Sequence, residues 1–476
     1  MRRGLFAAVV GLCLLRLIAG ALLPLSADEA YYWLWSRHLA AGYYDHPPAI
    51  AYLIRAGTML FGQTALGVRV GGILLSWLAS WFVWRLGAIL SGEEKTGALA
   101  CLFFNLTAMA TVESLAATPD APALLCAAAF FFCLAKVVET QDGRWWLAAG
   151  LAAGLTLLSK YTGLFLGAGA LVWLIASPPM RRWLLSPWPY LGGVLALALF
   201  APNLLWNAHH GWVTFAFQFG RIEAEHFTLR YLLEFFGAQA VLASPFILIL
   251  GVIGLAVSRH SPRQALLAAM ILPAVAYFAW HALHDRVQGN WPSFLYPLFC
   301  VGAAMAGEAD WRGWCKPVAR WSARLAVPVA AVLLLAAYAQ ALFGVMPLGR
   351  SDPLARLLAV GMGQVTDKIA ALRGGALLTT DYETTAWLDF YGKADAVQIG
   401  EDFRWPDLPA PPASLFTKPA LYICTTRRDR HDLIAAHFRQ VSEIARFDRQ
   451  RRGVPIAHYL VYRVEGLKGA PVGRQP

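Results

Sequence analysis

The sequence predicts a polytopic α-helical membrane protein with about eleven transmembrane helices and a small C-terminal α/β domain outside the membrane. Of the 476 residues, 58% are hydrophobic and only 14% are charged, and the mean hydropathy is +0.50. Soluble domains carry roughly 25% charged residues, so most of this chain must face lipid or other helices. The 19 Trp and 16 Tyr also suit the two membrane–water interfaces.

Long apolar runs recur up to about residue 346. The first run follows Arg2 and Arg3 and approaches the roughly 20 residues that a span needs, which favours an uncleaved helix over a signal peptide. The fifth and sixth runs are short and nearly continuous, as in a tight hairpin or a broken helix. The expected spans are 5–24, 66–90, 97–114, 121–138, 146–159, 161–177, 189–206, 231–257, 264–281, 292–308 and 324–346.

The basic residues predict the orientation of the bundle. Arg2 and Arg3 place the N-terminus in the cytoplasm, and counting spans then puts Arg181 and Arg182 on the same side, as the positive-inside rule requires. The sequence therefore predicts a multi-pass inner-membrane protein, with a first outer loop at about 25–65. Arginines that fall on the outer side, such as Arg221, are candidates for binding an anionic group.

The tail changes character. Apolar runs shorten, and charge and proline increase, so we expect a transmembrane domain over 1–346 and a soluble periplasmic α/β domain over 347–476. The pattern predicts strands at 376–380, 420–425 and 458–464 and helices at 382–391 and 429–438.

Several function classes lack support. The net charge of +11 is spread over short clusters between apolar runs, which is typical of orientation signals and not of a nucleic-acid-binding module. The seven cysteines form no CxxC and no metal-binding spacing. Because the chain has no Gly-rich phosphate loop, HExxH or GxSxG, a soluble nucleotide-sugar or ATP site is not indicated.

The unusual polar residues fall on the predicted outer side. Asp28 follows the first helix, Asp120 ends the second outer loop, and Lys160 interrupts an apolar stretch. Each has a plain structural explanation: the carboxylates could complement helix N-termini, and the lysine could snorkel to the interface. Together they indicate a site, because ionisable groups at membrane depth are costly and usually functional.

Such a group of residues has what transfer chemistry on a phosphorylated lipid needs. A carboxylate can take a proton from an attacking hydroxyl, and cations can stabilise the departing phosphate. Asp45 with His226 could hold a divalent metal ion, the one cofactor that the sequence suggests.

Six short motifs resemble one family. They are Asp28-Glu29-Ala30-Tyr31-Tyr32, Tyr43-Tyr44-Asp45-His46-Pro47-Pro48, Thr118-Pro119-Asp120, Leu158-Ser159-Lys160-Tyr161-Thr162-Gly163-Leu164, Trp206-Asn207-Ala208-His209-His210-Gly211-Trp212 and Gly289-Asn290-Trp291-Pro292. In order and spacing, over residues 1–310, they are similar to the GT-C glycosyltransferases. The resemblance is to the bacterial branch related to protein O-mannosyltransferases and to the aminoarabinose transferases of lipid A.

The resemblance implies a GT-C fold, a polyprenyl-phosphate sugar donor and inverting transfer to an envelope acceptor at the periplasmic membrane face. That acceptor could be lipid A, lipopolysaccharide, another glycan or a protein. It implies catalytic roles for Asp28 and Asp120, and donor-phosphate contacts for Lys160 and Arg221. The other implied substrate-binding residues are Glu29, Tyr32, His46, Tyr161 and Asn290. Asp45 stands where some relatives carry a metal-binding glutamate, and His46 where they carry a lysine.

A lipid or sugar transporter, or a flippase, is the alternative from another class. Transporters also carry ionisable residues near the midplane, often with internal repeats and broken helices. No repeat is visible in this sequence, and the long first outer loop favours a reaction chamber. Release of sugar from a prenyl-phosphate donor distinguishes the two, because a transporter moves its substrate intact.

Overall fold

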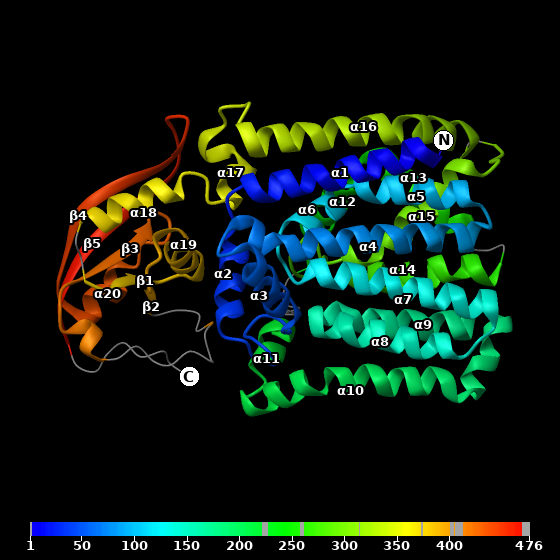
Figure 1. Ribbon diagram of the computed structural model, residues 1–476, viewed down its shortest axis with the longest axis horizontal. Helices are drawn as coiled ribbons and strands as arrows, with labels where there is room; N and C mark the ends of the chain where they lie inside the picture. Colours follow the sequence, from blue (N-terminus) through cyan, green and yellow to red (C-terminus); the bar gives the residue numbers. More distant parts are fainter. Residues whose placement is uncertain are drawn as a thin grey trace.

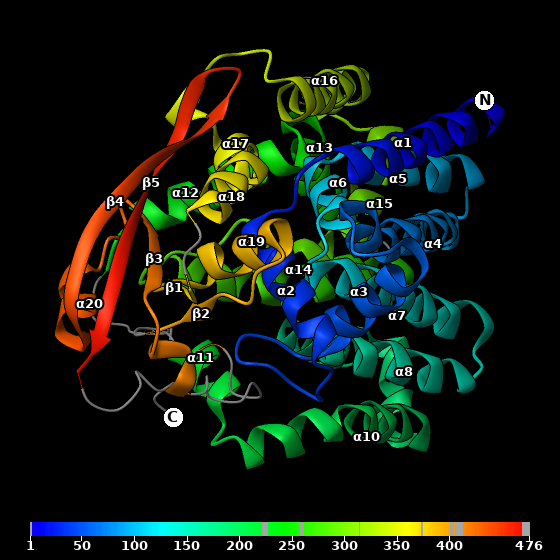
Figure 2. The same cartoon turned by 60° about the vertical axis from the view of Figure 1, so that its left-hand side comes forward.

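The computed structural model describes residues 2–220, 227–257, 261–313, 315–372, 375–399, 404 and 413–468. A helical bundle occupies one side of the molecule, and a sheet lies across one end of it (Figure 1). The N-terminus lies at the opposite end of the bundle. Figure 2 shows that α2 and α3 lie between the sheet and the long helices.

Within the residues that the structure describes, five helices are long and apolar enough to cross a membrane, and three helix pairs with sharp bends raise the number to as many as eight. The chain is therefore a multi-pass membrane protein, although the expected count of about eleven spans stays a prediction. The five are α4 (Ala65–Ser91), α7 (Asp120–Thr140), α10 (Pro187–His209), α14 (Pro262–His281) and α16 (Cys315–Phe343).

Two of the bent pairs correct expected straight spans, 97–114 and 231–257, whereas the third bend falls where the expected span 161–177 ends. The pair α5 (Glu94–Leu106) and α6 (Ala108–Leu115) bends by 65° where the Thr107 side chain caps the second helix. The segment 161–185 bends by 115°, and the pair α12 and α13 bends by 106°. Their elements are η1 (Tyr161–Gly163), α9 (Leu164–Ala176), η2 (Pro178–Leu185), α12 (Arg230–Ala243) and α13 (Pro245–Val257).

The remaining helices of the bundle are shorter, apart from α1. Glycines allow some of them to pack closely: a Cβ on Gly150 of α8 would lie 2.1 Å from the carbonyl oxygen of Gly192 in α10. These helices are α1 (Arg2–Leu22), α2 (Ala27–Arg37), α3 (Ala49–Phe61), α8 (Arg144–Ser159), α11 (Val213–Phe219), η3 (Ser293–Leu295) and α15 (Tyr296–Glu308).

The tail contains a five-stranded sheet of order β2-β1-β3-β5-β4, parallel from β2 to β3 and antiparallel from β3 to β4. The three predicted strands are confirmed, whereas β2 and β4 were not predicted. The strands are β1 (Leu377–Thr379), β2 (Val397–Gln398), β3 (Ala420–Thr425), β4 (Phe438–Arg451) and β5 (Val454–Leu467). The helices are η4 (Gly349–Ser351), α17 (Pro353–Leu357), α18 (Met362–Ala371), α19 (Tyr382–Gly392), η5 (Ala413–Phe416) and α20 (His431–His437).

The tail and the first outer segment share one hydrophobic core. Tyr31 and Trp33 of α2 belong to the same buried cluster as Trp387 of α19 and Val461 of β5. The backbone N–H of Leu25 also donates to the Tyr391 hydroxyl at 2.7 Å. The sheet is thus fixed against the end of the bundle where the polar motifs lie.

Candidate active site

The start of α2 is fixed by a buried ion pair. Ser26 and Glu29 form a reciprocal capping box, and Arg69 of α4 donates to both Glu29 oxygens at 2.6 and 2.7 Å. The backbone N–H of Ala117 donates to the same carboxylate at 3.1 Å. Both oxygens of Glu29 are thus bound by groups of the protein itself. The structure therefore indicates that Glu29 positions the start of α2, whereas the family resemblance implied a contact with substrate.

Asp28, the neighbour of Glu29, points to a different partner. Its Oδ1 accepts a hydrogen bond of 3.0 Å from the Tyr382 hydroxyl of α19. Burial raises the pKa of the Asp28 carboxyl above its usual value, and the charge of Asp45 adds to this. The hydrogen bond from Tyr382 and the charge of Arg404 act in the opposite direction. A carboxylate with a raised pKa is a better proton acceptor.

The charges of three carboxylates act on the Tyr32 phenol. Its pKa is raised well above its usual value, first by burial and then by the charges of Asp28, Asp45 and Asp120. The half-buried His46 ring lies 6.2 Å from the Tyr32 ring, centroid to centroid. The structure therefore gathers residues from three separate sequence motifs around one phenol.

Asp120 and Lys160 form a buried ion pair. Lys160 directly follows α8, and Asp120 is the first residue of α7. The Lys160 ammonium lies 2.7 and 2.8 Å from the two carboxylate oxygens of Asp120. Asn290 donates to the same carboxylate at 3.0 Å, and the Ser293 hydroxyl also donates to it. Three predicted site residues are therefore in direct contact, and Ser293 joins them.

Tyr161 connects this pair to the first outer loop. Its hydroxyl donates to the Asn203 side chain of α10 at 3.0 Å, and Asn203 donates to the backbone carbonyl of Ala41 at 2.8 Å. The ring of Tyr161 stacks on Phe215 of α11.

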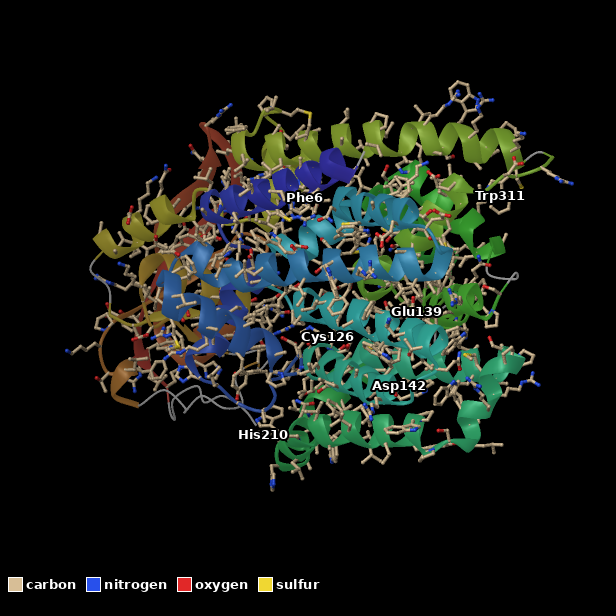
Figure 3. All side chains as sticks on the ribbon, turned by 45° about the vertical axis from the view of Figure 1, so that its right-hand side comes forward. Phe6, Cys126, Glu139, Asp142, His210 and Trp311 are labelled. Atoms are coloured by element: carbon tan, nitrogen blue, oxygen red, sulfur yellow. The ribbon has the colours of Figure 1, made fainter. Side chains whose placement is uncertain are left out.

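His210, which follows α10, lies on the sheet side of the bundle, whereas Trp311 lies at the far end (Figure 3).

Asp45 is paired with a cation from the tail. Arg404 lies 2.9 and 3.1 Å from its two oxygens, and the guanidinium also sits 4.4 Å from the Tyr382 ring centroid. Within the described part of the chain, no group of three or more His, Cys, Asp and Glu side chains could hold a metal ion. His226 and Arg221 lie outside the described residues. A metal held by Asp45 and His226 stays a prediction, and Asp45 as it stands does not fit that role.

The tail supplies site residues that the sequence did not indicate. Tyr382 and Arg404 are more than 350 positions from the carboxylates they contact, and no local motif marks them. Glu113 of α6 was also missed; it is buried and accepts a hydrogen bond of 3.1 Å from Thr118, close to Asp120. Because Glu113 interrupts an apolar run, the sequence alone could have marked it as a candidate site residue.

The fold and the site define a class of protein: a multi-pass membrane protein with a buried carboxylate on a short helix, covered by a small sheet at one end of the bundle. The family model described as dolichyl-phosphate-mannose-protein mannosyltransferase matches residues 45–206.

Two curated relatives come from Rhizobium johnstonii. The lipid A galacturonosyltransferase RgtD is 29% identical over 276 residues, which is 56% of this chain and 58% of the relative. The lipopolysaccharide core galacturonosyltransferase RgtA is 25% identical over 196 residues, 40% of this chain and 39% of the relative. The matches thus span less than two thirds of either relative.

Solved structures show the same fold over nearly the whole chain. ArnT from Cupriavidus metallidurans, solved bound to undecaprenyl phosphate, has a TM-score of 0.66 at 15% identity, covering 97% of this chain and 98% of that one. The oligosaccharyltransferase AglB from Archaeoglobus fulgidus has a TM-score of 0.52 at 12% identity, covering 88% and 69%. These findings confirm the resemblance: the chain has the GT-C fold and is similar to glycosyltransferases of that family.

Proposed function

We propose that this chain is an inverting glycosyltransferase that moves a sugar from a polyprenyl-phosphate donor to an acceptor of the cell envelope. The acceptor would be lipid A, lipopolysaccharide, another glycan or a protein. The observation that carries the proposal is the position of Asp28 in a GT-C bundle: it is a half-buried carboxylate whose charge acts on the same phenol, Tyr32, as the charge of Asp120, and Asp120 is paired with Lys160. Relatives that transfer galacturonic acid to lipid A and to the lipopolysaccharide core, and a fold neighbour bound to undecaprenyl phosphate, support it. They also argue against the transporter alternative.

Asp28 would act as the general base. The acceptor oxygen attacks the anomeric carbon from the side opposite the phosphate, while a carboxylate oxygen of Asp28 takes the hydroxyl proton. The bond between the anomeric carbon and the phosphate oxygen breaks, and polyprenyl phosphate leaves with both bonding electrons. The raised pKa of Asp28 favours this proton transfer. If the attacking atom belongs to a phosphate, no base is needed, and Asp28 would only position it.

Lys160 would stabilise the departing phosphate. An ammonium carries three N–H donors, and Lys160 makes two contacts with Asp120. At least one donor is therefore available for a phosphate oxygen, while Asp120, itself held by Asn290, keeps the lysine in place. Arg221 is proposed for the same phosphate from its position in the sequence alone.

The proposed location is the bacterial inner membrane, with the N-terminus in the cytoplasm and residues 347–476 as a periplasmic domain. The positive-inside pattern supports this orientation, because Arg181 and Arg182 lie in η2, next to the end of α9 remote from Lys160.

Transfer from a labelled donor tests the proposed function. The purified protein in lipid nanodiscs would be given polyprenyl-phosphate galacturonic acid with the label in the sugar, and lipid A as acceptor. We expect the label to move to lipid A with release of one polyprenyl phosphate per sugar. A reaction without lipid A is the control. Donor that crosses a proteoliposome membrane with its sugar–phosphate bond intact would instead support a transporter.

A further inference from the structure

A cavity of about 580 Å³ lies where α2 meets the tail, outside the Asp120–Lys160 pair. Asp28 and Tyr382 line it together with five arginines from the tail. This arginine cavity is large enough for a sugar headgroup, since small-molecule sites range over about 300–1,000 Å³. The arginines are Arg350, Arg356, Arg427, Arg428 and Arg449.

Two of these arginines are held by the protein. Arg428 pairs with Asp381 at 2.9 Å and with Glu383 at 2.7 Å. Arg449 is only 3% exposed and donates to the Leu358 carbonyl at 2.7 Å. Its Nε nevertheless has no hydrogen-bond partner within the described residues, and a buried donor without a partner is costly. Arg449 thus adds a fixed positive charge to the cavity wall, while its Nε is enclosed by protein atoms and is not itself offered to a ligand.

The other three arginines are exposed and have no ion pair or side-chain hydrogen bond among the residues that the structure describes. Arg350 and Arg356 come from the segment that connects α16 to α18, and Arg427 follows β3. Solvated surface arginines would explain any one of them. However, these three arginines line the same cavity as the buried Arg449. Only two carboxylates, Asp28 and Glu383, line it with them, so the cavity carries an excess of positive charge.

We propose that the arginine cavity binds an anionic group, phosphate or carboxylate, of the acceptor glycolipid and so places the acceptor hydroxyl against Asp28. Guanidinium groups suit both oxyanions because their paired N–H donors match the oxygen spacing. Lys160 and Asp120 do not line the cavity, so the donor phosphate has a separate place and the cavity approaches Asp28 from the tail. This inference rests on the proposed function and assigns acceptor selection to the tail.

Binding of lipid A tests the cavity without requiring transfer. The full-length protein in nanodiscs would be titrated with bisphosphorylated lipid A, with its dephosphorylated form and with polyprenyl phosphate. We expect Arg356→Ala/Arg427→Ala to weaken binding of bisphosphorylated lipid A about tenfold or more. Binding of dephosphorylated lipid A and of polyprenyl phosphate should not change. Arg463→Ala is the matched control, since Arg463 is half-exposed on β5 and outside the cavity.

A second variant separates loss of charge from loss of fold. Arg356→Lys/Arg427→Lys keeps both charges and should retain most of the binding that the alanine variant loses. Equal affinity of the wild type for the two forms of lipid A would overturn the proposal. The proposal would also be overturned if the alanine variant weakened the binding of polyprenyl phosphate as much as the binding of lipid A, because the cavity would then bind the donor. Intact selective binding without sugar transfer would contradict the proposed function and leave the anion site standing.

Discussion

At the residue scale, the sequence motifs identified the charged groups but not their partners. Asp28 and Asp120 were found as carboxylates of the outer loops, Lys160 because it interrupts an apolar stretch, and Asn290 through the family resemblance. Asp120 is in direct contact with both Lys160 and Asn290. Tyr382 could not be found in this way, because a tyrosine in an ordinary helix carries no local signal. Its contact with Asp28 depends on how the tail docks.

Tyr382→Phe should shift the pH dependence of transfer to a hydroxyl acceptor. The Tyr382 hydroxyl donates to the charged form of Asp28 and thereby lowers the pKa of Asp28, so its removal raises that pKa. The base is then protonated at a higher pH, and the acid limb of kcat/KM should move upward by about one to two pH units. Tyr52→Phe, at a half-exposed tyrosine on α3, is the control. Superimposable profiles for wild type and Tyr382→Phe would rule out this role.

At the element scale, α2 is the part of the fold that presents the proposed base. Its start is fixed by the reciprocal capping box of Ser26 and Glu29. The pairing of Glu29 with Arg69 was not predicted, because Arg69 lies in an apolar span and Glu29 is 40 positions away in the sequence. Likewise, β4 was missed because most of its side chains are only partly buried or exposed, so it has no strong alternation.

Removal of Glu29 should destabilise the protein. Glu29→Ala leaves the Arg69 guanidinium buried without its counter-charge, which costs about 3–5 kcal/mol. Burial alone would raise the pKa of Glu29, but Arg69 and the backbone donors lower it overall. The stabilisation is therefore present at neutral pH and is lost as the pH falls through the lowered pKa.

The measurement is the thermal unfolding midpoint in detergent at pH 7. Glu94→Ala provides the matched control, since its pair with Arg85 is exposed and worth about 0–1 kcal/mol. Glu29→Ala/Arg69→Met should recover part of the loss. Equal midpoints for Glu29→Ala and Glu94→Ala would contradict the assigned positioning role.

At the scale of the whole molecule, composition predicted a membrane bundle followed by an α/β tail, and the helices and the sheet agree with that order. The bends within the expected spans 97–114 and 231–257 were not predicted, because two helices that meet at Thr107 or at Pro245 read as one apolar run. The packing of the tail against α2 also has no sequence signal. That packing completes the site, with Tyr382 and Arg404 from the tail and the carboxylates from the first outer segment.

Single-turnover transfer by Asp28→Asn tests the central claim most directly, because the substitution removes the base and keeps the shape of the side chain. With a saturating polyprenyl-phosphate sugar and a hydroxyl acceptor, we expect the rate to fall about 10²–10⁴-fold while donor affinity and the unfolding midpoint stay near those of wild type. Asp310→Asn, at a carboxylate that is 92% exposed, should transfer at the wild-type rate. A well-folded Asp28→Asn protein that also transfers sugar at that rate would contradict the account.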